Sequence, residues 1–282
     1  MPGKLFITDL DGTLLRDDKT IGDRDSAALE RLGNLGICRA AATGRSLYSF
    51  LGLMENLKKS RPGWDLPLDY VIFSTGAGIM DYPACSLLKT FSLNPGEVVR
   101  AAACFEEQGL DYMVHRPVPD TREFMYRYQG GDNPDFLARI SLYKAFGSSL
   151  DGRDLSGFGP ATELLAILPP AVDTSVVGLI RSRLDGLNVI RATSPLDHVS
   201  TWVEVFPATV SKSRAAAWLA GRIGVDPLTV MSVGNDYNDV DLLEWSGRGL
   251  VVANAPGDLR CRFVTVGSNN ECGMADAIAQ WL

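Results

Sequence analysis

Two aspartates follow the first apolar run of the chain and could bind a cation or transfer protons. Asp9 and Asp11 come directly after Leu5-Phe6-Ile7-Thr8 and precede Gly12. Side chains alternate along a strand, so both carboxylates are expected on one side of the backbone. Two carboxylates held this close repel each other unless a cation lies between them or one is protonated. The pair therefore indicates a metal site, an acid–base site or both.

The Asp9–Gly12 stretch has two other possible interpretations, an exposed turn and a calcium-binding loop. An exposed Asp-Gly turn remains an alternative, because both residue types favour turns. A calcium-binding loop of the EF-hand type is excluded, because Leu14 and Thr20 occupy the positions where that loop needs a glycine and a bidentate glutamate.

Two further stretches could bind an anion such as a phosphoryl group. Thr43 and Gly44 follow a short apolar run and offer a hydroxyl and a backbone amide. Lys212 stands at the expected start of a helix, where its charge and the free backbone N–H groups both favour anions. Each alone has a plain structural interpretation, as a turn and as a solvated lysine.

A fourth stretch, residues 232–243, ends an apolar run in a cluster of oxygen-bearing side chains. Asn235, Asp236, Asn238 and Asp239 stand within five positions of one another. Hard cations such as Mg2+ prefer oxygen ligands of this kind. Helix capping by Asn238 or Asp239 is the structural alternative, and both roles are compatible.

Composition bounds the class of protein. The chain has 282 residues, 46% of them hydrophobic, and 27 basic against 34 acidic residues, for a net charge of -7. This balance opposes non-specific binding to nucleic acid or anionic membranes. Five scattered cysteines without a Cys-x-x-Cys pair, and only two histidines, indicate neither a disulfide framework nor a zinc site. No signal peptide or membrane span is expected, so we predict a cytoplasmic protein.

Alternating strand and helix patterns predict an α/β fold with a Rossmann-like parallel sheet core. In the first part we expect helices over 23–36 and 47–57 and strands over 37–42 and 70–73. In the last part we expect helices over 211–223 and 239–245 and strands over 229–233 and 249–252. Asp9, Asp11 and Thr43 then lie at carboxyl ends of strands, where functional loops of such sheets gather.

The middle of the chain differs and predicts an inserted α+β cap domain. Strands are expected over 88–92, 110–115, 187–192 and 201–206, helices over 95–108, 134–146 and 172–184, and an exposed connection over 147–160, and residues 163–168 form a further part of this unit. Residues 1–81 and 202–282 would then form one discontinuous core, and residues 82–201 the cap.

In their order and spacing, the four stretches resemble the motifs of the haloacid dehalogenase-like (HAD) hydrolase superfamily, and within it the Cof-type phosphatases of subclass IIB. The motifs fall on residues 9–13, 43–45, 212 and 234–239. The resemblance implies a nucleophile at Asp9 and a general acid–base at Asp11. It also implies phosphate contacts from Thr43, Gly44, Lys212 and Asn238, and a Mg2+ site at Asp9, Asp11, Asn235 and Asp239.

The chain departs from that family pattern at Asn235, where an aspartate is usual. A neutral ligand leaves the site less negative, so weaker Mg2+ binding is expected. Asp236 is an alternative ligand.

The resemblance implies hydrolysis of a small phosphorylated metabolite, most simply a sugar phosphate, through an aspartyl phosphate. A phosphotransferase or phosphosugar mutase, and a non-catalytic phosphosugar-binding protein, are the rival interpretations. A dehalogenase is disfavoured, because Asp11 would have no catalytic role in it. A membrane ATPase is excluded, because it needs membrane-spanning helices that the sequence does not predict. We expect a monomer or small homo-oligomer.

Specificity is expected from the cap. His115, Arg122, Arg127 and Tyr128 form a candidate cationic and aromatic patch for a polar, anionic substrate, with Arg116 and Tyr126 nearby in sequence. A solvated face is the alternative, and His198 and Glu204 are weaker candidates for the same role.

Overall fold

The structure is a computed structural model and describes residues 3–150, 152 and 155–282. The chain forms two compact units. The first consists of residues up to 45, 49–89 and 211–282, and the second of residues 90–210 together with 46–48. The main crossings between the units fall at residues 89/90 and 210/211, eight or nine residues after the expected 81/82 and 201/202.

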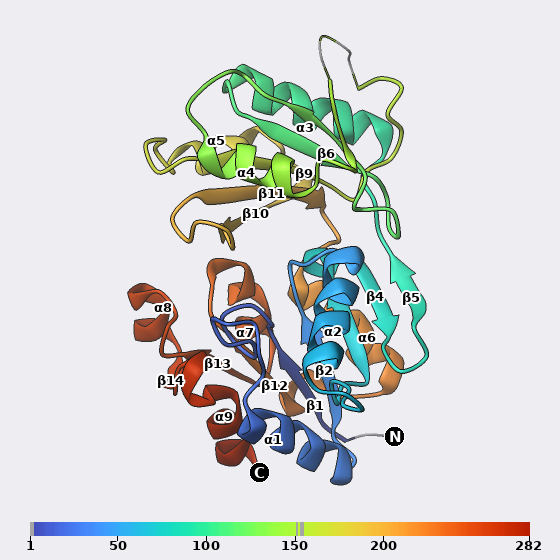
Figure 1. Ribbon diagram of the computed structural model, residues 1–282, viewed down its shortest axis with the longest axis vertical. Coiled ribbons are helices and arrows are strands. Elements are labelled where there is room, and N and C mark those ends of the chain that lie inside the picture. The colour runs from blue at the N-terminus through green and yellow to red at the C-terminus, as the bar shows by residue number, and fades with distance from the viewer. Residues whose placement is uncertain (1–2, 151, 153–154) are drawn as a thin grey trace. The chain divides into compact units, whose positions relative to one another are not determined.

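The first unit is built on an eight-stranded sheet with the order β14-β13-β12-β1-β2-β3-β4-β5 (Figure 1). Its strands are β1 (Leu5–Thr8), β2 (Cys38–Ala42), β3 (Tyr70–Phe73), β4 (Gly78–Asp81), β5 (Ser86–Thr90), β12 (Val230–Gly234), β13 (Arg248–Val252) and β14 (Val264–Val266). Its helices are α1 (Asp23–Asn34), α2 (Leu47–Ser60), α6 (Lys212–Ile223), α7 (Val240–Trp245), α8 (Gly257–Arg262) and α9 (Gly273–Trp281).

The central strand β1 is buried on both faces. Leu5 and Ile7 belong to a core cluster that also contains residues of α6 and α7. Phe6 points the other way, and its ring centroid lies 6.3 Å from that of Trp281 in α9. Helices on both faces explain why β1 is a continuous apolar run rather than an alternating one.

The sheet of this unit is mixed, although a parallel one is predicted. The strands from β14 through β12, β1 and β2 to β3 are parallel, but β4 runs antiparallel to β3. The chain reverses at residues 74–76, where Gly76 has φ +108°. The sequence prediction missed β4 because this reversal replaces the expected helical connection.

The second unit is built on a six-stranded sheet with the order β10-β11-β9-β6-β7-β8. Its strands are β6 (Tyr112–His115), β7 (Phe124–Arg127), β8 (Gly147–Ser149), β9 (Glu163–Leu168), β10 (Leu187–Thr193) and β11 (Thr201–Pro207), and its helices are α3 (Pro95–Glu107), α4 (Pro134–Leu142) and α5 (Val176–Arg183). One core cluster joins α3 and α5 to one face of the sheet, and another joins α4 to the opposite face. The unit is therefore α+β, as expected.

Local differences from the predicted elements have simple causes. Strand β8 lies within the predicted connection 147–160, because its Gly-Ser-Ser sequence carries no apolar signal and its order comes from pairing with β7. Residues 151, 153 and 154 of that connection lie outside the described residues. Helices α4 and α5 are shorter than predicted, since the apolar spacing continues past their hydrogen-bonded turns.

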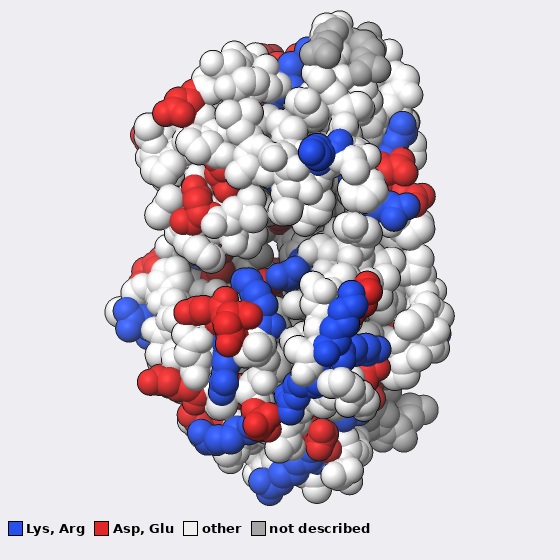
Figure 2. Space-filling model, in the orientation of Figure 1, with Lys and Arg blue, Asp and Glu red and all other residues white. Residues whose placement is uncertain are grey.

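The surface carries charges of both signs. On the face shown in Figure 2, acidic and basic side chains lie interspersed. In the described part of the chain, no helix is both long enough and apolar enough to cross a membrane.

Candidate active site

The four sequence motifs meet at one edge of the first unit's sheet. Strands β2, β1 and β12 are adjacent and parallel, so the loops after Ala42, Thr8 and Gly234 leave the sheet at the same edge. The backbone N–H of Asp9 donates to Val233 O at 2.9 Å, which continues the pairing one residue beyond β1.

The carboxylates of Asp9 and Asp11 contact different cations. Regular strand geometry ends at Thr8, and Gly12 has φ +74° in the turn that follows. Asp9 is almost fully buried and contacts Lys212, whereas Asp11 contacts Arg45 and Lys19. The turn therefore gives the two aspartates different cations.

Lys212 lies fully buried between two carboxylates. Its Nζ atom is 2.8 Å from Asp9 Oδ1 and 2.5 Å from Asp239 Oδ1. Burial alone would lower the pKa of Lys212, but the two carboxylates outweigh it and hold that pKa above its usual range. Lys212 therefore carries a positive charge against Asp9, at the first turn of α6 where Ser211 caps the helix.

Burial also shapes the chemistry of Asp9. Desolvation raises the pKa of this carboxyl, and the ammonium of Lys212 opposes the rise. A poorly solvated carboxylate of raised basicity is a stronger nucleophile than a solvated one. This site thus suits Asp9 for attack on an electrophile.

Asp239 is not free to serve as the metal ligand that we expected. Oδ1 accepts from Lys212, and Oδ2 accepts from the backbone N–H groups of Asn235 and Asp236 at 2.9 and 3.1 Å. A Cβ atom at Gly234 would lie 2.6 Å from this side chain, so the loop requires glycine there. We therefore correct the assignment of Asp239 as a Mg2+ ligand: this side chain orients Lys212 and the loop that follows β12.

Asn235 lies where a cation would need an oxygen ligand. One terminal atom of its amide is 3.3 Å from Asp9 Oδ2, 3.1 Å from the Asp11 carbonyl oxygen and 3.2 Å from Thr13 Oγ1. The nitrogen can donate to these oxygens, whereas the oxygen in the same place would join them in facing a cation. The donor set of Asp9, the Asp11 carbonyl and Asn235 thus fits a hard divalent ion with a single carboxylate.

The proposed donor set contains a single acidic side chain, that of Asp9. Across residues 3–150, 152 and 155–282, no three His, Cys, Asp or Glu side chains are grouped to hold a metal. A site with one carboxylate, one carbonyl and one amide has little charge of its own.

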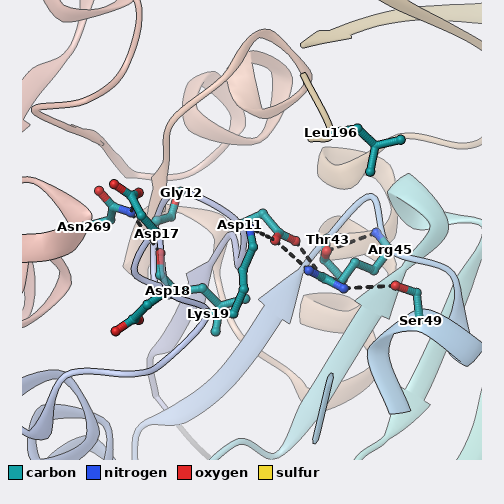
Figure 3. A network of polar contacts seen from close by, with 12 residues as sticks. Asp11, Gly12, Asp17, Asp18, Lys19, Thr43, Arg45, Ser49, Leu196 and Asn269 are labelled. Carbon is teal, nitrogen blue, oxygen red and sulfur yellow. Dashed lines mark hydrogen bonds and ion pairs between the residues drawn. The ribbon is translucent and has the colours of Figure 1, made fainter. Parts of the chain in front are cut away.

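Asp11 is held by two cations. Arg45 binds it with two nitrogens, and Lys19 Nζ lies 3.2 Å from Asp11 Oδ1 (Figure 3). Burial alone would raise the pKa of Asp11, but hydrogen bonds and charge from Arg45 and Lys19 lower it below its usual value. The contacts therefore favour the ionised form.

The expected phosphate-binding residues lie together. Thr43 is buried, and its hydroxyl accepts from the Arg45 N–H at 3.0 Å. A Cβ atom at Gly44 would lie 3.6 Å from Thr75 Oγ1 and 3.8 Å from Asn238 Nδ2. Gly44 and Asn238 are therefore neighbours, and Thr75, held at φ +54°, joins them.

Sequence reasoning missed Arg45, Lys19, Ser49 and Thr75 as parts of this site. Arg45 stands in the Thr-Gly-Arg triplet of the second motif, which is the one signal that could have identified it. Lys19, Ser49 and Thr75 carry no local signal, because only the folded chain places them near the motifs.

The candidate specificity residues are held by different neighbours within the second unit. Arg122 is exposed, with its guanidinium 5.2 Å from the Phe146 ring centroid. Arg127 pairs with Glu106 at 3.3 Å, and Tyr128 donates to Gly131 O at 2.6 Å.

His115 is not part of an exposed patch. The side chain is buried, and Nδ1 lies 2.8 Å from Thr121 O. Desolvation and the nearby charge of Arg139 lower the pKa of His115 to about 3, so it remains neutral. A buried neutral imidazole does not contribute charge to substrate recognition, and we withdraw His115 from the patch.

The fold and the site together define an α/β protein with a large inserted unit and a buried Asp–Lys–Asp centre. Residues 6–278 match the family model described as haloacid dehalogenase-like hydrolase. The chain belongs to this family, as the motif resemblance indicated.

Individual relatives cover nearly the whole chain. The 5-amino-6-(5-phospho-D-ribitylamino)uracil phosphatases YwtE and YcsE of Bacillus subtilis are 25% and 23% identical, over 99% of this chain and 98% and 96% of theirs. A solved phosphatase of the superfamily from Bacteroides thetaiotaomicron has a TM-score of 0.76 at 17% identity, over 99% of this chain and 95% of that one. A solved HAD subclass IIB sugar phosphatase has a TM-score of 0.74 at 16% identity, over 99% and 98%. The solved structures support the α/β fold with an inserted unit.

Proposed function

We propose that the protein is a magnesium-dependent phosphatase that hydrolyses a small phosphomonoester, most simply a sugar phosphate, through an aspartyl phosphate. The observation that carries the proposal is Asp9, a buried carboxylate paired with an equally buried lysine at the edge where the other motifs meet. Binding alone would need no desolvated nucleophile. The names of the relatives, which are phosphatases of phosphorylated metabolites, point the same way.

In the proposed first step, Asp9 attacks phosphorus and the bond from phosphorus to the leaving oxygen breaks. Its electron pair goes to that oxygen, which takes a proton from the Asp11 carboxyl. In the second step, water attacks the phosphorus, gives a proton to Asp11, and the bond from phosphorus to Asp9 breaks. Arg45 and Lys19 favour ionised Asp11, which is the form that the second step uses.

The remaining residues would neutralise and orient the phosphoryl group. Lys212 would supply positive charge, and Thr43, Gly44 and Asn238 neutral donors. Phosphatases of this superfamily generally use a divalent metal. Asp9, the Asp11 carbonyl and Asn235 would hold Mg2+, which would stabilise negative charge on the transferring group.

A phosphate-release assay tests the proposal. Purified protein with Mg2+ is incubated with a panel of sugar phosphates, nucleotides, phosphorylated cofactors and p-nitrophenyl phosphate. Release of inorganic phosphate is expected. Transfer of the phosphoryl group to an added sugar without release would favour the phosphotransferase, and binding without turnover would favour a binding protein.

Asn235 predicts that activity needs a raised Mg2+ concentration, because a neutral ligand binds the ion more weakly than a carboxylate. We expect Asn235→Asp to lower the half-saturating Mg2+ concentration by about tenfold, because it adds a second carboxylate to the donor set. Activity and thermal stability are measured against Mg2+ concentration. Asn34→Asp, at the exposed end of α1, adds the same charge elsewhere and serves as the control. An unchanged half-saturation in Asn235→Asp would count against Asn235 as a ligand.

We further propose that the inserted unit selects the substrate, with Arg122, Arg127 and Tyr128 as candidate contacts. Arg122→Ala is expected to change the relative rates across the sugar phosphate panel by about 3- to 10-fold, the effect of losing one accessible charge contact. Arg100→Ala, exposed on α3, is the matched control. If both variants keep the wild-type order and ratios of rates, Arg122 does not contact the substrate.

A further inference from the structure

Arg45 holds Asp11 with a two-pronged ion pair. Nε lies 2.6 Å from Asp11 Oδ2, and Nη2 lies 2.7 Å from Oδ1. A planar guanidinium that binds both carboxylate oxygens fixes the orientation of the carboxylate as well as its charge. In Figure 3 the guanidinium points directly at the Asp11 carboxylate.

Arg45 is itself held from three sides. Nη1 donates to Ser49 Oγ in α2 at 2.9 Å, the backbone N–H donates to Thr43 Oγ1, and the backbone carbonyl accepts from Ser74 N–H at 2.8 Å. These bonds fix the arginine at both its backbone and its guanidinium. A fixed arginine can transmit a fixed position to the carboxylate that it binds.

The two oxygens of Asp11 are not held equally. Among the described residues, Oδ1 accepts from both Arg45 Nη2 and Lys19 Nζ, whereas Oδ2 accepts from Arg45 Nε. The doubly bound Oδ1 is the anchored oxygen. The oxygen with fewer bonds, Oδ2, is the one that can exchange a proton while the carboxyl keeps its place.

We propose that Arg45, braced by Ser49, is a positioning residue that anchors Oδ1 of Asp11 and so places Oδ2 for proton transfer. This inference rests on the proposed phosphatase function. In the first step the Oδ2–H bond breaks as the leaving oxygen gains the proton, and in the second step Oδ2 takes a proton from the attacking water. Arg45 touches neither the phosphoryl group nor the leaving oxygen in this role.

The leaving group distinguishes positioning from phosphate binding. An alkoxide leaves poorly without a proton, whereas p-nitrophenolate leaves without one. A misplaced Asp11 carboxyl therefore slows formation of the aspartyl phosphate from an alkyl phosphate far more than from p-nitrophenyl phosphate. The second step is the same for both substrates, so the comparison uses kcat/KM, which reports only the steps up to release of the leaving group. An arginine that bound the phosphoryl group would affect both substrates alike.

The experiment measures kcat and KM of Arg45→Lys, Arg45→Met and Ser49→Ala on p-nitrophenyl phosphate and on the sugar phosphate that the wild type hydrolyses fastest. For the Arg45 variants we expect kcat/KM on the sugar phosphate to fall about 30- to 100-fold, the order of loss caused by small misplacements of catalytic groups. We expect a fall of less than about fivefold in kcat/KM on p-nitrophenyl phosphate, and inhibition by inorganic phosphate within about threefold of the wild type. Ser49→Ala should shift the ratio in the same direction but less.

Arg39→Lys is the matched control. Arg39 binds Asp69 through Nε and Nη2 at 3.0 and 2.8 Å, near the start of β2 and away from the motif loops. It should leave the ratio of the two substrates unchanged. Equal losses of kcat/KM of the Arg45 variants on both substrates, or weaker inhibition by inorganic phosphate, would overturn the positioning role. Such a result would leave the phosphatase proposal intact, whereas a wild type that hydrolyses neither substrate would overturn both.

Discussion

Asp9→Asn is expected to lower phosphomonoester hydrolysis by about 10 000-fold or more, the order of loss seen when a covalent nucleophile is removed. An amide oxygen is a poor nucleophile, so the aspartyl phosphate would not form. The fold should persist, because Asn keeps an oxygen that can accept from Lys212, and Lys212 keeps Asp239 as its counter-ion.

The measurement has two parts that exclude a folding artefact. Phosphate release is followed for wild type, Asp9→Asn and Asp23→Asn, the last being a control at an exposed aspartate of α1. Circular dichroism and thermal unfolding show whether each variant is folded. Wild-type enzyme quenched during turnover should also carry a phosphoryl group that hydroxylamine releases. A folded Asp9→Asn variant with near-normal turnover would falsify the assignment of the nucleophile.

Lys212→Met is expected to destabilise the protein by about 3–5 kcal/mol and to remove most of the activity. Two buried carboxylates, Asp9 and Asp239, would lose the cation that lies between them, and an uncompensated buried charge carries a cost of that order. Methionine fills a similar volume without charge. Urea unfolding of wild type and variant gives the change in the free energy of unfolding.

The pH dependence of this loss has a definite sign. Burial raises the pKa of Asp9, and loss of the opposing ammonium of Lys212 raises that pKa further above its unfolded value, so the folded variant binds more protons than the unfolded chain. Unfolding free energy therefore falls as pH rises, and the destabilisation by Lys212→Met should be larger at pH 8 than at pH 5. A loss below about 1 kcal/mol at pH 8 would contradict the buried ion pairs.

A second variant separates stability from chemistry. Lys212→Met combined with Asp239→Asn removes one of the two unpaired carboxylates, and part of the stability should return. Activity should stay low, because the positive charge next to Asp9 is still missing. Recovery of activity together with stability would mean that Lys212 acts only as a structural counter-ion.

Much of the fold could be predicted from the sequence because its signals are local. Helix α1 begins at its predicted first residue, and strand β3 matches its predicted range. Strand β4 and strand β8 were missed for the opposite reason. Their existence depends on pairing with β3 and β7, which a short stretch of chain does not encode.

The site divides in the same way. Asp9, Thr43, Lys212 and the acidic loop at 234–239 could be selected from sequence, because each follows an apolar run or opens a helix. Partners could not be selected, because Lys212 and Asp239 are 27 positions apart and Asp11 and Arg45 are 34 apart. His115 illustrates the limit, since a histidine looks the same in sequence whether its strand position is exposed or buried.

The sequence by itself determined the order of the four motifs, the α/β alternation and the insertion, because residue type and spacing carry that information. Only the tertiary structure decided which side chains contact one another in the site. It placed Lys212 between Asp9 and Asp239, turned Asp11 toward Arg45, and put Asn235 where an oxygen would face a cation. The physical reason is that burial and charge pairing depend on distances in space, and the end of β1 sets those distances.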